Sequence, residues 1–483
     1  MIQALCAVAG RLRAGIVGVA MPFGTFMDLL RRKPSERALE PFVGETPEDA
    51  LYGVEPLRIL IAPLAGDTQG LAARHIHDRL SGRAGVSLSV ADRPLTAPGA
   101  DNNQALFVSM AVDLGRRWLK REGADLLIWG ESIPAAGANG LGTAWRLRFL
   151  SRATPLHPQS ASFSALERLE VPALFDDATG DLAFGVALAA VSVESADGIR
   201  ARATMFRPVL KAATRFAEGD FIGTVAQCAT AQASYAALLL LEGARTGDVK
   251  MLQRAVAVYQ GALILGEDAF PTHERAMIGS HIADAMAVVS DLSSRPKLSD
   301  RTVEYYRAAL GMVRKEVFAD DYAALKVRLG LALHALAQSA DEPIHLKEAA
   351  ESFSEATAIW TITEAPDRWA DIQNSLGGLL ITMGRLTKQP SLFDKAVTIF
   401  LKIAEARTRK KSPLVWATTL ANIGAAMKEK GVVARNLDYL KQAAQAFDLA
   451  GQVFAELNLE SNVKIVETQR DHVLLMLAAQ GAR

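Results

Sequence analysis

A row of polar side chains recurs along the second half of this 483-residue chain and is the pattern best suited to molecular recognition. Hydroxyl, imidazole, guanidinium and amide groups all form hydrogen bonds and could bind a peptide backbone in a groove. The alternative interpretation is a solvated helix face, which also carries polar residues at regular spacing. The row consists of Ser234, His281, Arg328, Ser375 and Asn422, each 47 residues after the last, with Asn374 beside it.

A second candidate is a basic cluster that follows a predicted helix and consists of Arg407, Arg409, Lys410 and Lys411. Cations near a helix C-terminus are stabilised by the negative end of the helix dipole, so a purely structural role is one interpretation. The alternative is a patch that docks an anionic partner.

Patterns for catalysis or metal binding are weak in this sequence. The glycine-rich stretch from Gly137 to Gly142 leads into a predicted strand, whereas a phosphate-binding loop needs a helix N-terminus, so we interpret it as a hairpin loop. His75 and His77 would lie on different sides of a helix, without a nearby set of cysteine or acidic ligands. Glu131 is a lone carboxylate. We therefore expect no catalytic residue, no cofactor and no metal, and the chain is not predicted to be an enzyme.

The elements that position these residues repeat every 47 residues. Self-similarity at a fixed period of this length is typical of stacked repeats, in which each unit buries its apolar face against its neighbours. Small residues occupy one position of the repeat, and aromatic residues occupy another, four residues later. The small residues are Ala255, Thr302, Ala349, Ala396 and Ala443, and the aromatic residues are Tyr259, Tyr306, Phe353, Phe400 and Phe447.

One copy of the repeat shows its pattern most clearly. Leu376 and Gly377 form a pair in its first helix, and Ala396 precedes Phe400 by four positions in its second. This copy resembles the tetratricopeptide repeat, a helical hairpin of 34 residues, with the additional residues divided between its turns. The resemblance covers residues 222–458 as five variant repeats. It implies a right-handed superhelical, all-α solenoid whose groove binds a protein or peptide partner.

Glycines and prolines fit this hairpin. We expect Gly330, Gly377 and Gly424 to let neighbouring helices approach closely, and the aromatic residues to fill the gap between successive hairpins. Ser412 followed by Pro413 predicts a helix start, with serine as the N-cap. Prolines in the turn inside the repeat should end one helix and set the entry to the next; they are Pro296, Pro343 and Pro390.

Strand and helix patterns alternate between residues 57 and 155, which predicts a small α/β sheet domain before the solenoid. Within Trp145 to Leu150, apolar residues alternate with basic ones, which favours a strand with one solvent-exposed face. Residues 152–175 are expected to be loop and short helix. The patterns predict strands at 57–64, 86–90, 124–133 and 145–150, and helices at 66–80 and 102–122.

The run from Ala124 to Glu131, followed by Trp145 to Leu150, is similar to small bacterial domains of the TolB amino-terminal or FlgO type. Such domains often precede tetratricopeptide arrays, and the resemblance implies assembly or envelope-linked interaction without catalysis. The expected organisation is an apolar and basic helical segment (1–33), a linker (34–56), the sheet domain (57–155), a connector with a degenerate helical repeat (156–221), the repeats (222–458) and a capping helix (459–483).

The segment from Ala14 to Leu30 is mostly apolar and is flanked by arginine and lysine residues on both sides. Its 17 residues fall short of the roughly 20 that a membrane-spanning helix needs, and they include Pro22 and Asp28. We expect it to lie on a surface, in a cytoplasmic protein. The alternative is association with the inner membrane through this segment.

Composition narrows the classes of partner. Lysine plus arginine equals aspartate plus glutamate, 53 each, and this balance argues against nucleic acid because phosphate binding needs a cationic surface. The two cysteines, Cys6 and Cys228, lie far apart, which favours a reducing compartment. The sequence predicts a non-catalytic protein interaction scaffold. One alternative is a sensory or regulatory module whose α/β domain binds a small ligand, and a weaker one is an enzyme with its site between the two domains.

Overall fold

The described residues form two compact units, one that ends at Arg328 and one that begins at Leu329. The computed structural model describes residues 51–481, apart from residues 52, 97–102, 138–139, 153, 155–161, 192, 194–195, 217–222, 294–299 and 341–342. The segment 14–30 and Pro296 therefore lie outside the described residues, and the predictions made for them stay predictions.

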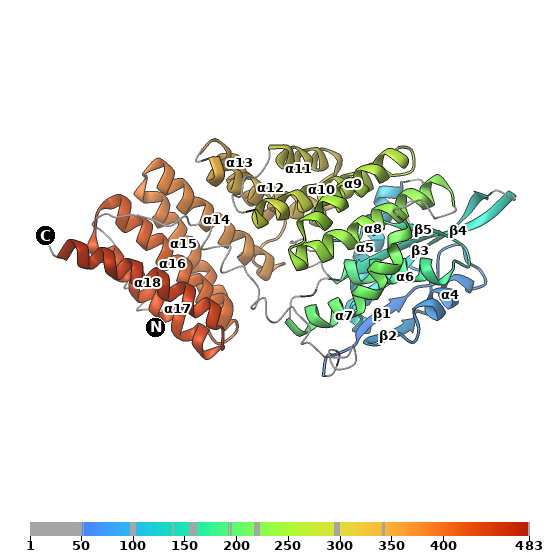
Figure 1. Cartoon of the computed structure of the whole chain (residues 1–483), viewed down its shortest axis with the longest axis horizontal. Coiled ribbons are helices and arrows are strands. Elements are labelled where there is room, and N and C mark those ends of the chain that lie inside the picture. The colour runs from blue at the N-terminus through green and yellow to red at the C-terminus, as the bar shows by residue number, and fades with distance from the viewer. Residues whose placement is uncertain are drawn as a thin grey trace. The chain divides into compact units, whose positions relative to one another are not determined.

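A five-stranded sheet forms the core of the N-terminal part, in the order β2-β1-β3-β4-β5 (Figure 1). β1 pairs in parallel with β2 and β3, whereas β3, β4 and β5 pair antiparallel. β3 and β4 pair as a hairpin up to Gly137 and Gly140, which confirms the predicted hairpin, but Gly140 and Gly142 are paired residues of β4 and do not belong to a loop. The strands are β1 (Leu57–Ile61), β2 (Val86–Val90), β3 (Leu126–Gly137), β4 (Gly140–Ser151) and β5 (Leu169–Pro172).

Helices cover both faces of this sheet. Apolar side chains such as Ile59 and Ile61 pack with the buried residues of α4 (Leu71–Leu80) and α6 (Asp177–Ala190). On the opposite face, α5 (Gln104–Glu122) approaches so closely that a Cβ on its Gly115 would lie 2.5 Å from Leu150. Two buried faces explain why the central strands read as almost continuous apolar runs.

Two expectations for this domain are wrong. Residues 169–172 form β5, where the sequence predicted loop and short helix. The basic residues of β4 do not share a solvent-exposed face, because Arg148 is only 2% exposed. A carboxylate from the repeat helices, Glu274, pairs with its guanidinium and makes this burial tolerable.

Helices that pack in sequence follow the sheet and form a helical solenoid. Among the described residues, the helix pair α6 and α7 precedes five hairpins in chain order, and a single helix, α18, follows them (Figure 1). The helices after α6 are α7 (Ala196–Ala213), α8 (Val225–Thr246), α9 (Val249–Leu265), α10 (Thr272–Leu292), α11 (Asp300–Met312), α12 (Ala319–Ala340), α13 (Leu346–Thr357), α14 (Pro366–Thr387), α15 (Pro390–Ala406), α16 (Pro413–Ala434), α17 (Leu437–Glu456) and α18 (Glu460–Gly481).

A glycine in the first helix of a hairpin contacts the aromatic ring in the second. A Cβ on Gly377 would lie 2.4 Å from the ring of Phe400. A Cβ on Gly424 would lie 2.9 Å from the ring of Phe447, and one on Gly330 would lie 2.8 Å from the ring of Phe353. The predicted close approach of helices is therefore confirmed. The expected place of the rings needs correction, because these contacts lie inside one hairpin and not between successive hairpins.

Prolines mark helix starts as predicted, but one cap differs. Pro390 and Pro413 are the first residues of α15 and α16, and Pro343 begins a short 3-10 helix before α13. Ser412 precedes α16 without a side-chain hydrogen bond to it, so the predicted serine cap is not formed. Among the described residues, no helix is both long and apolar enough to cross a bilayer.

We predict that Gly377→Ala lowers the free energy of unfolding by about 1–3 kcal/mol, because the added methyl group would overlap the ring of Phe400. Urea unfolding followed by circular dichroism measures the change. In a Phe400→Leu background the same substitution should cost much less, since the obstructing ring is gone.

Gly261→Ala is the control for helix propensity. Gly261 lies inside α9, and nothing would come within 4 Å of its Cβ. This variant should gain roughly 0.5–1 kcal/mol. Equal effects of the two alanines on stability would contradict the ring-contact explanation.

Candidate functional site

The predicted polar row lies inside the helix packing. Each member is carried by the first helix of a hairpin, α8, α10, α12, α14 or α16. The solvated-face alternative is therefore wrong for these side chains, and they offer little surface to a peptide. That a partner contacts them stays a prediction. The exposed fractions are 0% for Ser234, 3% for His281, 8% for Arg328, 7% for Ser375 and 0% for Asn422, and the neighbouring Asn374 is half-buried.

The row connects first helices of consecutive hairpins in the second unit. The Asn422 side-chain amide donates to the Asn374 oxygen at 2.5 Å, which joins α16 to α14. Gln469 on α18 extends the row by one more period and accepts a hydrogen bond from Lys428 at 3.0 Å. The 47-residue spacing from Asn422 was the signal that could have identified Gln469. Ser375 instead bonds within its own helix, to the carbonyl of Asp371.

In the first unit the row joins a charge network around His281. The imidazole lies between two carboxylates, with Nε2 2.9 Å from Glu167 and Nδ1 3.3 Å from Asp284. Arg328 donates to Asp284 at 2.8 Å, and the Tyr306 hydroxyl donates to the other oxygen of that carboxylate. Each of these side chains is less than 9% exposed, so two members of the predicted row, 47 residues apart, share one buried acid.

Burial and charge act in opposite directions on His281. Desolvation by itself lowers the pKa of a buried imidazole, but the carboxylates of Glu167 and Asp284 outweigh it and raise the pKa of His281 to about 9. The ring of Tyr259 stacks against the imidazole, with 5.9 Å between centroids. The raised pKa keeps the His281 imidazole protonated at neutral pH, between the carboxyl groups of Glu167 and Asp284.

A second ionic group connects the sheet to the same helix, α10. Glu274 pairs with Arg148 of β4 at 3.2 Å and with Arg168 at 2.6 Å, and all three side chains are at most 4% exposed. The neighbouring His273 has the opposite environment, because burial and these two arginines lower its pKa to about 3. We call Arg148, Arg168, Glu167, Glu274, His281, Asp284 and Arg328 together the buried charge cluster.

Sequence reasoning missed the acids of the buried charge cluster. Glu167, Glu274 and Asp284 are separated by up to 117 positions and share no motif, so only the folded chain brings them together. The two arginines that alternate within β4 were the available signal. A buried strand that carries arginine needs a carboxylate partner, and Glu170 and Glu274 supply it for Arg146 and Arg148. Glu131 lies 3.4 Å from Arg146 and is a half-buried ion-pair partner.

The basic cluster after α15 is partly paired with acids of α14, in the same hairpin, and of α17, in the next hairpin. Arg407 pairs with Asp367 before it, and Arg409 forms two contacts with Glu456 after it, at 2.5 and 2.6 Å. The Arg409 guanidinium also lies 5.9 Å from the ring centroid of Trp416. Lys410 and Lys411 are exposed, which leaves them available to an acidic partner.

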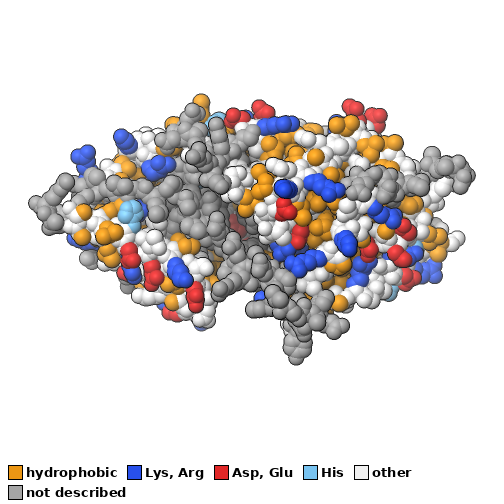
Figure 2. Space-filling model, viewed as in Figure 1, with side chains coloured by type: hydrophobic (Ala, Val, Ile, Leu, Met, Phe, Trp, Pro, Cys, Tyr) orange, Lys and Arg blue, Asp and Glu red, His pale blue; other side chains and the backbone are white. Residues whose placement is uncertain are grey.

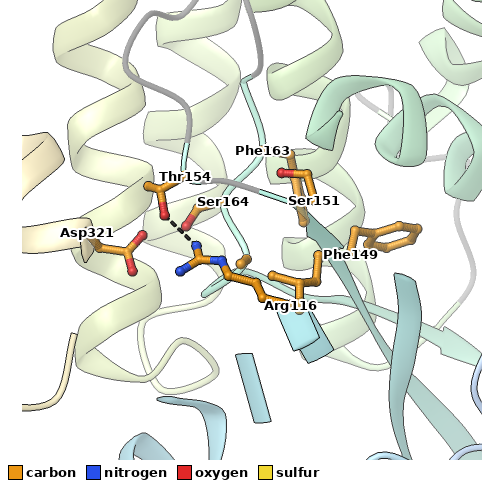
Figure 3. Close-up of a pocket in the computed structure, with 9 residues that line it drawn as sticks. Arg116, Phe149, Ser151, Thr154, Phe163, Ser164 and Asp321 are labelled. Atoms are coloured by element: carbon orange, nitrogen blue, oxygen red, sulfur yellow. Dashed lines mark hydrogen bonds between the residues drawn. The ribbon is translucent and has the colours of Figure 1, made fainter. Parts of the chain in front are cut away.

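A small pocket lies beside the sheet, wholly within the first unit. The Arg116 guanidinium points toward Thr154 and donates to its hydroxyl at 2.5 Å, with Asp321 across the pocket (Figure 3). Arg116 also pairs with Asp320 at 2.6 Å. The cavity volume of this pocket is about 10 Å³, which is room for about one water molecule. Pockets for small molecules are usually larger, roughly 300–1,000 Å³.

Comparison with known proteins does not assign this chain to a family. No family model and no curated protein matches this chain. Solved structures that match include BtubC (BKLC) from P. vanneervenii, at 20% identity over 52% of this chain and 88% of that one, with a TM-score of 0.33. Another is a circular tandem repeat protein, at 12% identity over 62% and 83% of the two chains, with a TM-score of 0.27. Such low scores support no functional argument.

We predict that Glu274→Gln destabilises the first unit by about 3 kcal/mol or more, because it leaves Arg148 buried without its carboxylate and Arg168 with only Glu170, at 3.5 Å. Thermal and urea unfolding measure the change. Glu456→Gln removes the exposed partner of Arg409 and should cost at most about 1 kcal/mol. A neutral effect of Glu274→Gln would contradict the structural importance of the cluster.

The raised pKa of His281 makes stability depend on pH. A folded-state pKa of about 9 lies above the ordinary 6.5, so the stabilisation is complete below pH 6.5 and is lost as pH rises through 9. Between these limits the wild type should lose roughly 3 kcal/mol relative to His281→Gln. The pKa of His273 is lowered to about 3, so its protonation changes the free energy of unfolding only below pH 6.5, outside the pH range in which the effect of His281 is lost. Parallel pH profiles for the two proteins would contradict the predicted charge state of His281.

Proposed function

We propose that this protein is a non-catalytic interaction scaffold whose helical repeats bind a peptide or helical segment of a protein partner. The observation that carries the proposal is the succession of helical hairpins from α8 to α17, followed by α18, in the part of the chain that the structure describes. Stacked hairpins of this kind create extended surfaces that small globular domains lack. In this proposal the repeats are a 47-residue variant of the tetratricopeptide repeat, in a bacterial cytoplasmic protein.

Rigidity of the array supports binding. The glycine–aromatic contacts within hairpins, and the hydrogen bond from Asn422 to Asn374 between hairpins, hold the repeats in fixed relation within the second unit. A preformed surface loses less conformational entropy when a partner binds. Because the polar row is buried, we assign recognition to exposed side chains of the repeats.

Charge favours a protein partner over nucleic acid. The formal net charge is zero, and Figure 2 shows basic and acidic side chains interspersed over the face in view. Lys410 and Lys411 provide a local cationic site on the repeats for an acidic segment. The ligand-sensing alternative gains no support from the pocket beside Arg116, whose size is below the usual range.

The proposal is tested by using the purified full chain as bait in native lysate, with chemical cross-linking and mass spectrometry of the captured complexes. We expect a saturable protein partner whose cross-links fall on residues 223–481. Lys410→Glu with Lys411→Glu should weaken capture of an acidic segment by about tenfold, through loss and reversal of the attracting charge.

Lys388→Glu with Lys395→Glu is the matched control, since it makes the same change in net charge at other exposed positions of the repeats. If both double variants capture the partner equally weakly, the loss of capture reflects the change in net charge alone and not a site at Lys410 and Lys411. Failure of the bait to retain any protein above background, or cross-links confined to the sheet, would overturn the scaffold proposal.

A further inference from the structure

The edge strand β2 has exposed side chains and a sequence without the residues that commonly block pairing at a sheet edge. It is the outer strand of the sheet next to β1, and Ser87, Ser89 and Val90 are exposed. Natural edge strands are commonly protected by lysine, proline or a bulge. The sequence of β2, Val-Ser-Leu-Ser-Val, contains neither a charged residue nor proline.

The pairing with β1 fixes which backbone groups of β2 point away from the sheet. The Gly85 carbonyl accepts a hydrogen bond from the Leu57 amide, and the Ala91 amide donates one to the Ile61 carbonyl. The backbone groups of residues 85, 87, 89 and 91 that form hydrogen bonds therefore point toward β1. Because successive residues of a strand alternate in this direction, Val86, Leu88 and Val90 direct their N–H and C=O groups outward. These groups can form a second ladder.

We propose that β2 is a self-association site, at which a second copy of this chain adds its own β2 antiparallel about a two-fold axis through Leu88. The strand is a palindrome, so this register places Val86 opposite Val90 of the second copy and Ser87 opposite Ser89 of the second copy. The outward-directed residues then face one another and exchange their N–H and C=O hydrogen bonds.

Side chains also match in this register. Val86 and Leu88 pack against the apolar core on one face of the sheet, and pairing would continue that apolar row across the axis. The serines line the opposite face and would meet as hydroxyl pairs. The result is one continuous sheet through both copies. Because the strand has only five residues, we expect weak, concentration-dependent association. The inference is independent of the proposed scaffold function.

Two double variants of the full chain test the proposal. Ser87→Lys with Ser89→Lys places lysine opposite lysine at both serine pairs, whereas Ser87→Lys with Ser89→Glu places lysine opposite glutamate. Both change the same exposed positions. Sedimentation equilibrium should show a wild-type dimer, a dissociation constant raised about tenfold or more in the first variant, and a retained dimer in the second.

Circular dichroism and thermal melting establish that both variants remain folded. A wild type that stays monomeric at all concentrations overturns the proposal, and so does a dimer that both variants weaken equally. Hydrogen exchange of the peptide that contains β2 distinguishes another occupant. If its amides are protected in a monomer, a segment of the same chain covers the edge and the proposal fails.

Discussion

The contact between a helical glycine and an aromatic ring sets the geometry on which the repeats depend. At Gly330, Gly377 and Gly424 any side chain would overlap the ring four positions after the small residue of the same repeat. The ring can be fully buried only because the glycine lets the two helices approach. The close approach recurs in each of these three hairpins, so the two helices of each hairpin pack in the same way.

Charge has a different role where the sheet meets the first repeats. Arg148 and Arg168 converge on Glu274, and His281 lies between Glu167 and Asp284, all with little access to water. Desolvation offsets most of the attraction in such groups, so their net contribution to stability is modest, but a mispaired arrangement would be costly. The cluster therefore favours one docking of α10 on the sheet over alternatives that apolar packing alone would tolerate.

The sequence predicts local features well and long-range partners poorly. The bounds of β2, the β3–β4 hairpin and the helix starts at Pro390 and Pro413 follow from short patterns of apolar, glycine and proline residues. The polar row illustrates the limit. Its period was visible, but period alone does not distinguish a solvated face from a buried one, and the burial of Asn422 depends on α14 and on Asn374. The sequence predicted that Arg148 lies on a solvent-exposed face, because its partner Glu274 belongs to the repeats and not to the sheet domain.

The separation between Arg148 and its carboxylate has a consequence for biosynthesis. Glu274 follows Arg148 by 126 residues, whereas the glycine and aromatic ring of a hairpin are only 23 residues apart in the chain. At a translation rate of roughly 5–20 residues per second, Glu274 is synthesised about 6–25 seconds after Arg148. In a hairpin, the aromatic residue is synthesised about 1–5 seconds after the glycine. A nascent chain therefore carries a sheet whose Arg148 lacks its carboxylate, while the three hairpins with a glycine–ring contact can form theirs almost as soon as they emerge from the ribosome.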